Sequence, residues 1–220
     1  MKNLLLILSL MFILTACGST QTQVQPKELS LIEQEAPLAI VIMPPINNSN
    51  NVDAKEYLYS SLAIPLINKG YYVFSPYLTL DLFQQESAYD AELFIDSDLS
   101  QFQKVLGADA VLFTVINHWQ KGLNTIQTNV EYILRSTHSN KELFRRQGDI
   151  SLDTSTSNSA SLAGLVVNLI STAATPIITA ARMSNVEGLK NLPIGKYRGG
   201  FPKGKLVTEQ EEEQEEGLED

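Results

Sequence analysis

The sequence predicts an α/β domain: a mixed sheet with helices packed on it, ordered strand-helix-strand-helix, then a three-strand antiparallel meander and a C-terminal apolar helix. Three observations predict it. Two nearly continuous apolar runs, Leu38–Met43 and Ala110–Ile116, are typical of strands buried on both faces. Apolar residues recur at helical spacing between them. From Ile126 to Leu134 apolar and polar residues alternate, which indicates a strand with one buried face.

The first strand is expected to stop at Pro44-Pro45, and Asp53 can cap the helix that follows. Pro65 lacks a backbone N–H, so this helix should kink or restart there. Asn68-Lys69-Gly70 should end it, because glycine readily adopts the left-handed conformation. The residues expected on the inner side of the helix are Tyr57, Leu58, Ser61, Leu62 and Leu66.

Tyr71–Phe74 is expected to form a short second strand, and Ser75-Pro76 to open another helix with proline at its first position. Asp98 can cap a further helix that ends at Gly107. The residues expected to share the inner face of that helix are Leu99, Phe102, Val105 and Leu106.

The meander begins with the third strand, Ala110–Ile116, and turns at Lys121-Gly122-Leu123-Asn124. The alternating strand comes next, with its apolar side chains expected on one face. Ser139-Asn140-Lys141 should turn the chain again, into a weaker strand over Leu143–Leu152.

Thr154–Ala181 contains no charged residue, and Leu162–Ala181 is strongly apolar. A membrane helix is one interpretation, but several polar residues and a kinking Pro176 favour a helix that is buried or faces a partner. We expect a homodimer or larger homo-oligomer through this segment, because large apolar patches usually mark interfaces. The candidate self-association residues are Leu165, Val166, Val167, Leu169 and Ile170.

The amino terminus has the pattern of a secretory signal peptide over residues 1–16: Lys2, the apolar run Leu4–Leu14, then small residues before Cys17. About eleven apolar residues are too few for a helix that spans a bilayer, which needs roughly twenty. Cys17 is the only cysteine, so it can form no internal disulfide. The alternative is an ordinary signal peptide with a chance cysteine.

Leu14-Thr15-Ala16-Cys17 resembles the bacterial lipobox. This resemblance implies that Cys17 is the lipidation site, carrying a diacylglyceryl group and an acyl chain such as palmitate, which together hold a protein firmly at a membrane. Gly18 stands where lipoproteins retained in the inner membrane commonly have Asp, so the resemblance implies the outer membrane. It leaves open whether the domain lies in the periplasm or on the cell surface.

The remaining chain divides into a polar tether over residues 17–36, a single α/β domain over 37–200 and an acidic, disordered tail over 201–220. The net charge is −9; Glu209–Asp220 contributes −8 and Lys2 +1, so −2 remains for the rest. This composition argues against nucleic acid as a partner. The tail is expected to be a solvated end, with a docking or cation-binding tail as the alternative.

No residue set points to a reaction, so we expect no enzyme, metal or cofactor. His118 and His138 lack the spacing of metal ligands, and there is neither a Gly-x-Ser-x-Gly elbow nor a phosphate-binding glycine loop. The candidate ligand or partner loop follows the first strand, at the end where α/β sheets bind ligands. Its residues are Asn47, Asn48, Ser49, Asn50 and Asn51. The alternative is a turn that only caps the next helix.

Together with the lipobox, three stretches resemble a family of bacterial lipoproteins without an assigned activity, catalogued as domain of unknown function seven hundred and ninety-nine. They are PLAIVIMPPINNSNNVDA, INKGYYVFSPY and GADAVLFTVINHW. The resemblance implies a fold similar to the amino-terminal domain of TolB and to the curli-secretion lipoprotein CsgG. It implies a non-catalytic component, a scaffold or auxiliary subunit, of an envelope transport or secretion assembly with other envelope proteins as partners. A periplasmic ligand-binding or hydrolytic domain that uses the Asn-rich loop is the alternative.

Overall fold

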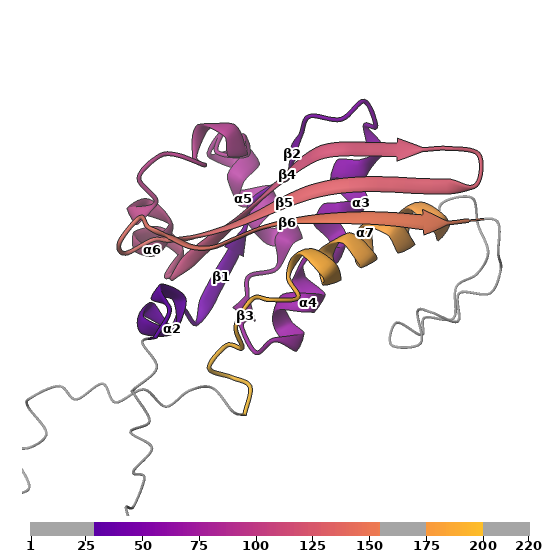
Figure 1. Ribbon diagram of the computed structural model, residues 1–220. Coiled ribbons are helices and arrows are strands. Elements are labelled where there is room, and N and C mark those ends of the chain that lie inside the picture. The colour runs from indigo at the N-terminus through magenta and orange to yellow at the C-terminus, as the bar shows by residue number, and fades with distance from the viewer. Residues whose placement is uncertain (1–28, 155–174, 200–220) are drawn as a thin grey trace, which may run out of the picture.

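Six strands form one mixed sheet in the order β3-β1-β4-β5-β6, with β2 also paired to β4 (Figure 1). The structure, a computed structural model, describes residues 29–154 and 175–199. Helices pack on both faces of the sheet. The α/β class and the three-strand antiparallel meander are therefore confirmed.

The sheet is parallel where β1 (Ala39–Ile42) lies between β3 (Tyr72–Val73) and β4 (Ala110–Lys121). Ile40 and Ile42 of β1 pack into the core on one face, whereas Val41 and Met43 pack into the core on the other. Every position of the strand's apolar run from Ile40 on is thus buried, as predicted for a central strand.

A short strand that the sequence pattern did not predict follows Pro44-Pro45. β2 (Ile46–Asn47) runs parallel to β4, with Ile46 opposite Val115 and Asn47 opposite Ile116. β1 ends before the two prolines, as predicted. After them the chain pairs again with the same edge of β4, further along that strand.

The meander consists of β4, β5 (Thr125–Ser136) and β6 (Glu142–Asp153), each twelve residues long. The predicted inward-facing residues of β5 are all buried: Ile126, Thr128, Val130, Tyr132 and Leu134. β4 continues to Lys121, so His118 lies inside the strand rather than at its end, next to a register shift between Ile116 and His118.

One face of the sheet is covered by α3 (Asp53–Ser61), α4 (Ala63–Asn68) and α7 (Thr175–Gly188). The break at Leu62 between α3 and α4 matches the restart expected from Pro65, whose missing N–H removes one helical bond. Gly70 has φ +88°, as expected for the residue that ends this helix.

The other face is covered near the start of β4 by α5 (Pro76–Gln85), the 3-10 turn η1 (Ala91–Leu93) and α6 (Ser100–Leu106). The Phe102 ring makes edge contacts with Phe83 and Phe94 at centroid distances of 5.9 and 5.5 Å. Val105 was expected on the inner face of α6 but is 72% exposed, because Phe102 and Leu106 occupy the side of that helix that faces the core.

Within the described residues α7 runs from Thr175 to Gly188, so it includes the last part of the apolar helix predicted over Leu162–Ala181 and continues beyond Ala181. Residues 155–174 lie outside the described residues, and with them all five candidate self-association residues, Leu165, Val166, Val167, Leu169 and Ile170. Among the helices that the structure describes, none is long and apolar enough to cross a membrane.

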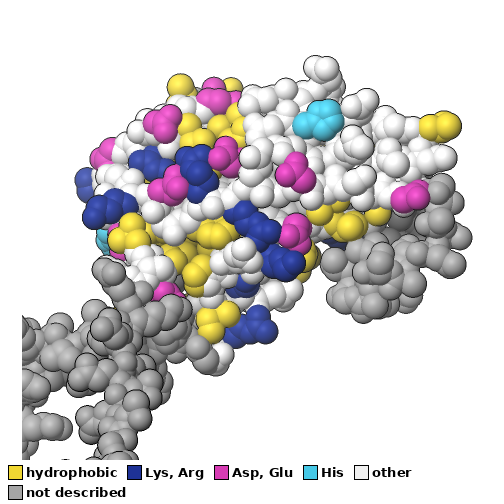
Figure 2. Space-filling view, in the orientation of Figure 1, with side chains coloured by type: hydrophobic (Ala, Val, Ile, Leu, Met, Phe, Trp, Pro, Cys, Tyr) yellow, Lys and Arg dark blue, Asp and Glu magenta, His cyan; other side chains and the backbone are white. Residues whose placement is uncertain are grey.

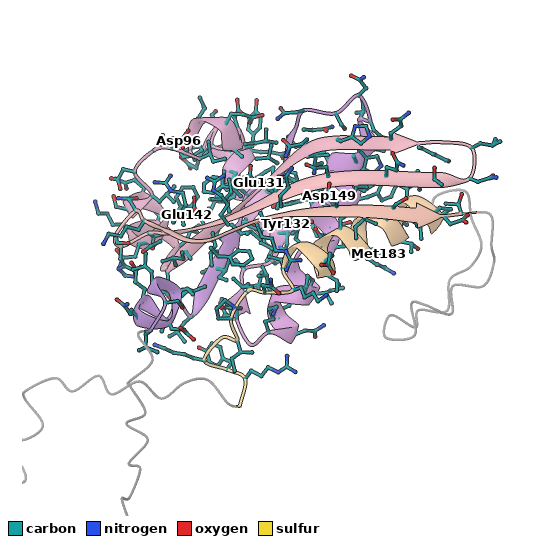
Figure 3. All side chains as sticks on the ribbon, in the orientation of Figure 1. Asp96, Glu131, Tyr132, Glu142, Asp149 and Met183 are labelled. Carbon is teal, nitrogen blue, oxygen red and sulfur yellow. The ribbon has the colours of Figure 1, made fainter. Side chains whose placement is uncertain are left out.

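α7 is tied to the sheet by buried, uncharged polar groups (Figure 3). The Tyr132 hydroxyl donates to Asn185 Oδ1 at 3.0 Å, and Asn185 Nδ2 donates to the Leu58 carbonyl at 3.0 Å and to Ser61 Oγ at 2.9 Å. Gly188 lies so close to the Tyr132 ring that a Cβ there would be 2.0 Å from Cε2. The helix can approach this closely only because position 188 has no side chain.

A short helix precedes the first strand, within the stretch expected to be tether. α2 (Leu31–Glu35) buries Ile32 in the core, and Glu35 accepts a hydrogen bond from Ser139 Oγ at 2.6 Å. The folded part therefore begins before residue 37, because Ile32 gives this polar stretch an apolar anchor. Cys17 and the acidic tail lie outside the described residues.

Candidate functional site

The Asn-rich loop satisfies its own polar groups. Asn47 Nδ2 donates to the Asn51 carbonyl at 2.8 Å, and Asn47 Oδ1 accepts from Ser49 Oγ at 2.7 Å. Asn51 Oδ1 accepts the N–H of Ala54 at 3.0 Å, so Asn51 rather than Asp53 caps α3. Asn48 and Asn50 are exposed to solvent. This geometry favours the interpretation of the loop as a turn.

A pocket of about 360 Å³ lies beside this loop, at the carboxyl end of β1. The Tyr59 hydroxyl in its wall donates to the Pro76 carbonyl at 2.7 Å, and burial raises the pKa of Tyr59 to about 12. This phenol therefore stays protonated at neutral pH and cannot act as a base. None of Asn47–Asn51 lines the pocket, whose walls are Pro44, Pro45, Val52, Lys55, Glu56, Tyr59, Tyr77, Leu80, Gln84 and Tyr89.

A second concave surface lies between α5 and α6, on the opposite side of the sheet from α7. This α5–α6 groove has a volume of about 400 Å³. Its floor contains the edge-packed rings of Phe83, Phe94 and Phe102. Val105 on its wall is largely exposed, and Leu93 nearby is 63% exposed. The remaining lining residues are Leu82, Glu86, Ala88, Gln101 and Leu106.

Acidic residues dominate the segment that builds this groove. Residues 76–107 contain six acidic side chains and a single basic one, Lys104, for a net charge of −5. Partial burial, together with a hydrogen bond to Asp90 and its charge, raises the pKa of Glu92. Figure 2 shows acidic side chains among hydrophobic ones on this part of the surface, at the upper left. The acidic residues are Asp81, Glu86, Asp90, Glu92, Asp96 and Asp98.

The structure does not bring the two histidines together. His138 lies in the turn after β5, and its Nε2 is 3.2 Å from Oδ1 of Asp109, the residue before β4. His118 is nine residues further along β4, about 30 Å away at the rise of an extended strand. Among the described residues no group of three or more His, Cys, Asp or Glu side chains could hold a metal ion.

Asp109 positions the backbone at the start of β1. Its Oδ2 accepts the N–H groups of Leu38 and Ala39 at 2.9 and 3.0 Å, which fixes the start of β1. Burial works to raise the pKa of Asp109, but the N–H donors of Ala39 and Leu38 and the neighbouring His138 hold that pKa below its usual value. The carboxylate is therefore ionised at neutral pH and occupied by backbone donors.

The α5–α6 groove is the feature that the sequence pattern missed. Its lining residues come from three separate elements, and only their packing makes the surface concave. One signal in the sequence was available: the acidic excess of residues 76–107 stands out against a folded part that is nearly neutral.

Comparisons with known proteins agree with a lipoprotein. Residues 28–188 match the family model described as "Putative lipoprotein GNA1162-like". The chain is 26% identical over 216 residues to "Putative lipoprotein NMB1124/NMB1162" of Neisseria meningitidis serogroup B, and the match covers 96% of this chain and 99% of that protein. The resemblances to TolB and CsgG stay predictions.

One solved structure supports the fold. Lipoprotein GNA1162 from Neisseria meningitidis superposes with a TM-score of 0.52 at 26% identity, over 59% of this chain and 92% of that one. A PelC dodecamer from Paraburkholderia phytofirmans superposes with a TM-score of 0.44 at 11% identity, over 69% of this chain and 85% of that one. Because the family model spans most of the described residues, this chain belongs to the GNA1162-like lipoprotein family.

Proposed function

We propose that this lipoprotein is a non-catalytic component, a scaffold or auxiliary subunit, of a transport or secretion assembly in the cell envelope. The observation that carries the proposal is the α5–α6 groove with its exposed apolar lining. Exposed apolar surface of this kind usually marks a place where another molecule binds. A groove floored by phenylalanine rings offers mainly apolar contact area, and Glu86 is the one ionisable side chain among its lining residues.

The alternative is a ligand-binding or hydrolytic domain that uses the Asn-rich loop. Such a site needs polar groups that converge on a pocket. Here the side chains of Asn47, Ser49 and Asn51 bond to one another and to the backbone, and the neighbouring pocket is lined by other residues. This supports the scaffold over the alternative.

Anchoring in the outer membrane through Cys17 is part of the proposal, and it has a direct test. Cys17→Ala removes the thiol that would receive the lipid, so the chain should appear as an unprocessed or soluble precursor. Membrane fractionation after a high-salt wash measures this. Cys17→Ala protein that still sediments with outer membranes would show that the attachment lies elsewhere.

The assembly role is tested by crosslinking in intact envelopes. A photoreactive residue in place of Val105 should capture a protein on the groove, whereas the same residue in place of Leu123 should capture little. Leu123 is 96% exposed in the turn between β4 and β5, away from the groove, so it serves as the matched control. Equal capture at the two positions would argue against the groove as a docking surface.

A further inference from the structure

The pocket beside the Asn-rich loop lies where two chain crossings leave the sheet on opposite faces. α3 and α4, which lead from β1 to β3, pack on one face, and α5 to α6, which lead from β3 to β4, pack on the other. The pocket opens between α3 and α5 at the carboxyl end of β1, and we call it the α3–α5 pocket. Open α/β sheets tend to bind their ligands at such a position.

A hydrogen bond holds the two walls of the α3–α5 pocket together. The hydroxyl of Tyr59 on α3 donates to the carbonyl of Pro76, the first residue of α5, at 2.7 Å. Pro44 and Pro45 also line the pocket, and both are buried. Their rings fix the backbone that follows β1. The pocket is thus formed in advance, so a ligand need not supply the free energy to order it.

Three tyrosines line the α3–α5 pocket, and each comes from a different segment. Tyr59 lies on α3, Tyr77 on α5 and Tyr89 in the loop after α5. Tyr59 is buried, whereas Tyr77 and Tyr89 are more than half exposed. Aromatic rings attract a cation that lies over their faces, and clusters of such rings recognise methylated ammonium groups. This side of the pocket is therefore suited to the apolar or ammonium part of a ligand.

Two adjacent residues give the same pocket one charge of each sign. Lys55 and Glu56 both line it, and both are exposed. Neighbours in a helix do not face each other, and neither residue forms a salt bridge within residues 29–154 and 175–199. Burial and Asp90 raise the pKa of Glu92, and the charge of Lys55 opposes that rise. Lys55 can still pair with an anionic group of a ligand, and Glu56 with a cationic one.

We propose that the α3–α5 pocket binds a small zwitterion, a molecule that carries an ammonium group and a carboxylate or phosphate group. The ammonium group lies against the tyrosines and pairs with Glu56, and the anionic group pairs with Lys55. A ligand with only an anionic group would leave Glu56 unpaired, and one with only a cationic group would place its charge beside Lys55. The volume of about 360 Å³ falls within the range of small-molecule pockets.

The inference goes beyond the proposed function, because it concerns another surface. The α5–α6 groove is lined by Leu82, Phe83 and Glu86 of α5 and its end, whereas the α3–α5 pocket is lined by Tyr77, Leu80 and Gln84. The two concave surfaces thus lie on different sides of α5. Photocrosslinking at the groove and ligand binding in the pocket can therefore fail separately.

The test is a calorimetric titration of the full chain, purified in a non-ionic detergent. Phosphocholine carries both charges, choline only the cation and inorganic phosphate only the anion. Phosphocholine should bind about tenfold more tightly than either single-charge probe. The neutral analogue of choline, in which carbon replaces nitrogen, should bind more weakly than choline. Absence of phosphocholine binding at millimolar concentrations would overturn the proposal, and so would equal affinity for phosphocholine and either single-charge probe.

Variants of the lining residues assign the two charges. Lys55→Met should lower the affinity for phosphocholine about fivefold without weakening choline, whereas Glu56→Gln should weaken both about fivefold. Tyr77→Leu should weaken choline, and Tyr77→Phe, which keeps the ring, should not. Leu78→Ala is the matched control, because Leu78 is exposed on the same helix and does not line the pocket. If neither charge variant has an effect, or if Leu78→Ala acts like Tyr77→Leu, the inference is wrong.

Reconstitution of the full chain in vesicles separates two sources of the zwitterion. If the pocket takes a lipid headgroup, phosphocholine should bind in vesicles of phosphatidylglycerol but not in vesicles of phosphatidylcholine, whose headgroups already occupy the pocket. If the pocket takes a free solute, the affinity for phosphocholine should be the same in both, and glycine betaine should compete with it. Binding in neither kind of vesicle would contradict the proposal.

Discussion

The two helix layers are attached to the sheet in different ways. α7 is joined through buried neutral groups, Tyr132 and Asn185, and through the close approach of Gly188. The segment between α5 and α6 is held by Arg135, whose guanidinium donates to the carbonyls of Phe94, Ile95 and Ser97. The first attachment leaves no space, whereas the second holds a loop in place beside an open groove. One layer therefore completes the core, and the other presents a surface.

The largest effect should come from filling the close contact on the α7 side. Gly188→Ala places a Cβ 2.0 Å from a fully buried tyrosine ring, so α7 must move or the ring must leave its position. We expect a loss of about 3 kcal/mol in the free energy of unfolding, measured by urea denaturation with circular dichroism. Gly199→Ala is the control, because nothing lies within 4 Å of the Cβ added there. Equal stability of the two variants would mean that α7 does not pack this closely.

A smaller effect is expected on the groove side. Arg135→Met keeps the aliphatic part of the side chain but removes the donors to four carbonyls, those of Phe94, Ile95, Ser97 and Asn140, at a cost of about 2 kcal/mol. Hydrogen exchange should then rise in residues 94–99 and stay unchanged in α7. A uniform rise across both layers would show that the layers do not behave differently.

The smallest effect is expected from the acidic end. Truncation after Thr208 removes residues that carry like charges and almost no apolar surface, so the melting temperature should change little. Scanning calorimetry of the truncated and full chains makes this comparison. A clear drop would indicate that the tail docks on one of the two layers.

The elements that could be predicted from the sequence are those whose burial repeats along the chain. β1 is buried on both faces and therefore has a continuous run of apolar residues. β5 has one mainly buried face, so its apolar residues recur at every second position. β2 could not be predicted, because two residues after a double proline have no period. The sequence predicted Asp53 as the residue that caps α3, whereas Asn51 accepts the hydrogen bond. Both residue types are good caps, and only the fold selects between them.

The candidate site was harder to predict than the fold. The place of the Asn-rich loop after the first strand could be predicted. The hydrogen bonds that its side chains make within the loop could not, because they depend on the backbone path. The groove arises where α5, the segment after η1 and α6 leave apolar side chains such as Val105 uncovered, and this depends on tertiary packing. The lipid site at Cys17 follows from a local motif and stays a prediction, because it lies outside the described residues.

Trp119 has a practical consequence for observing this molecule. It is the only tryptophan of the chain, it is 3% exposed, and it lies toward the far end of β4, away from the α5–α6 groove. Its fluorescence should therefore have the blue-shifted maximum of a buried indole and resist quenching by acrylamide. A red shift that precedes the loss of the circular dichroism signal would report the meander tip opening on its own, at a single site in an unlabelled protein.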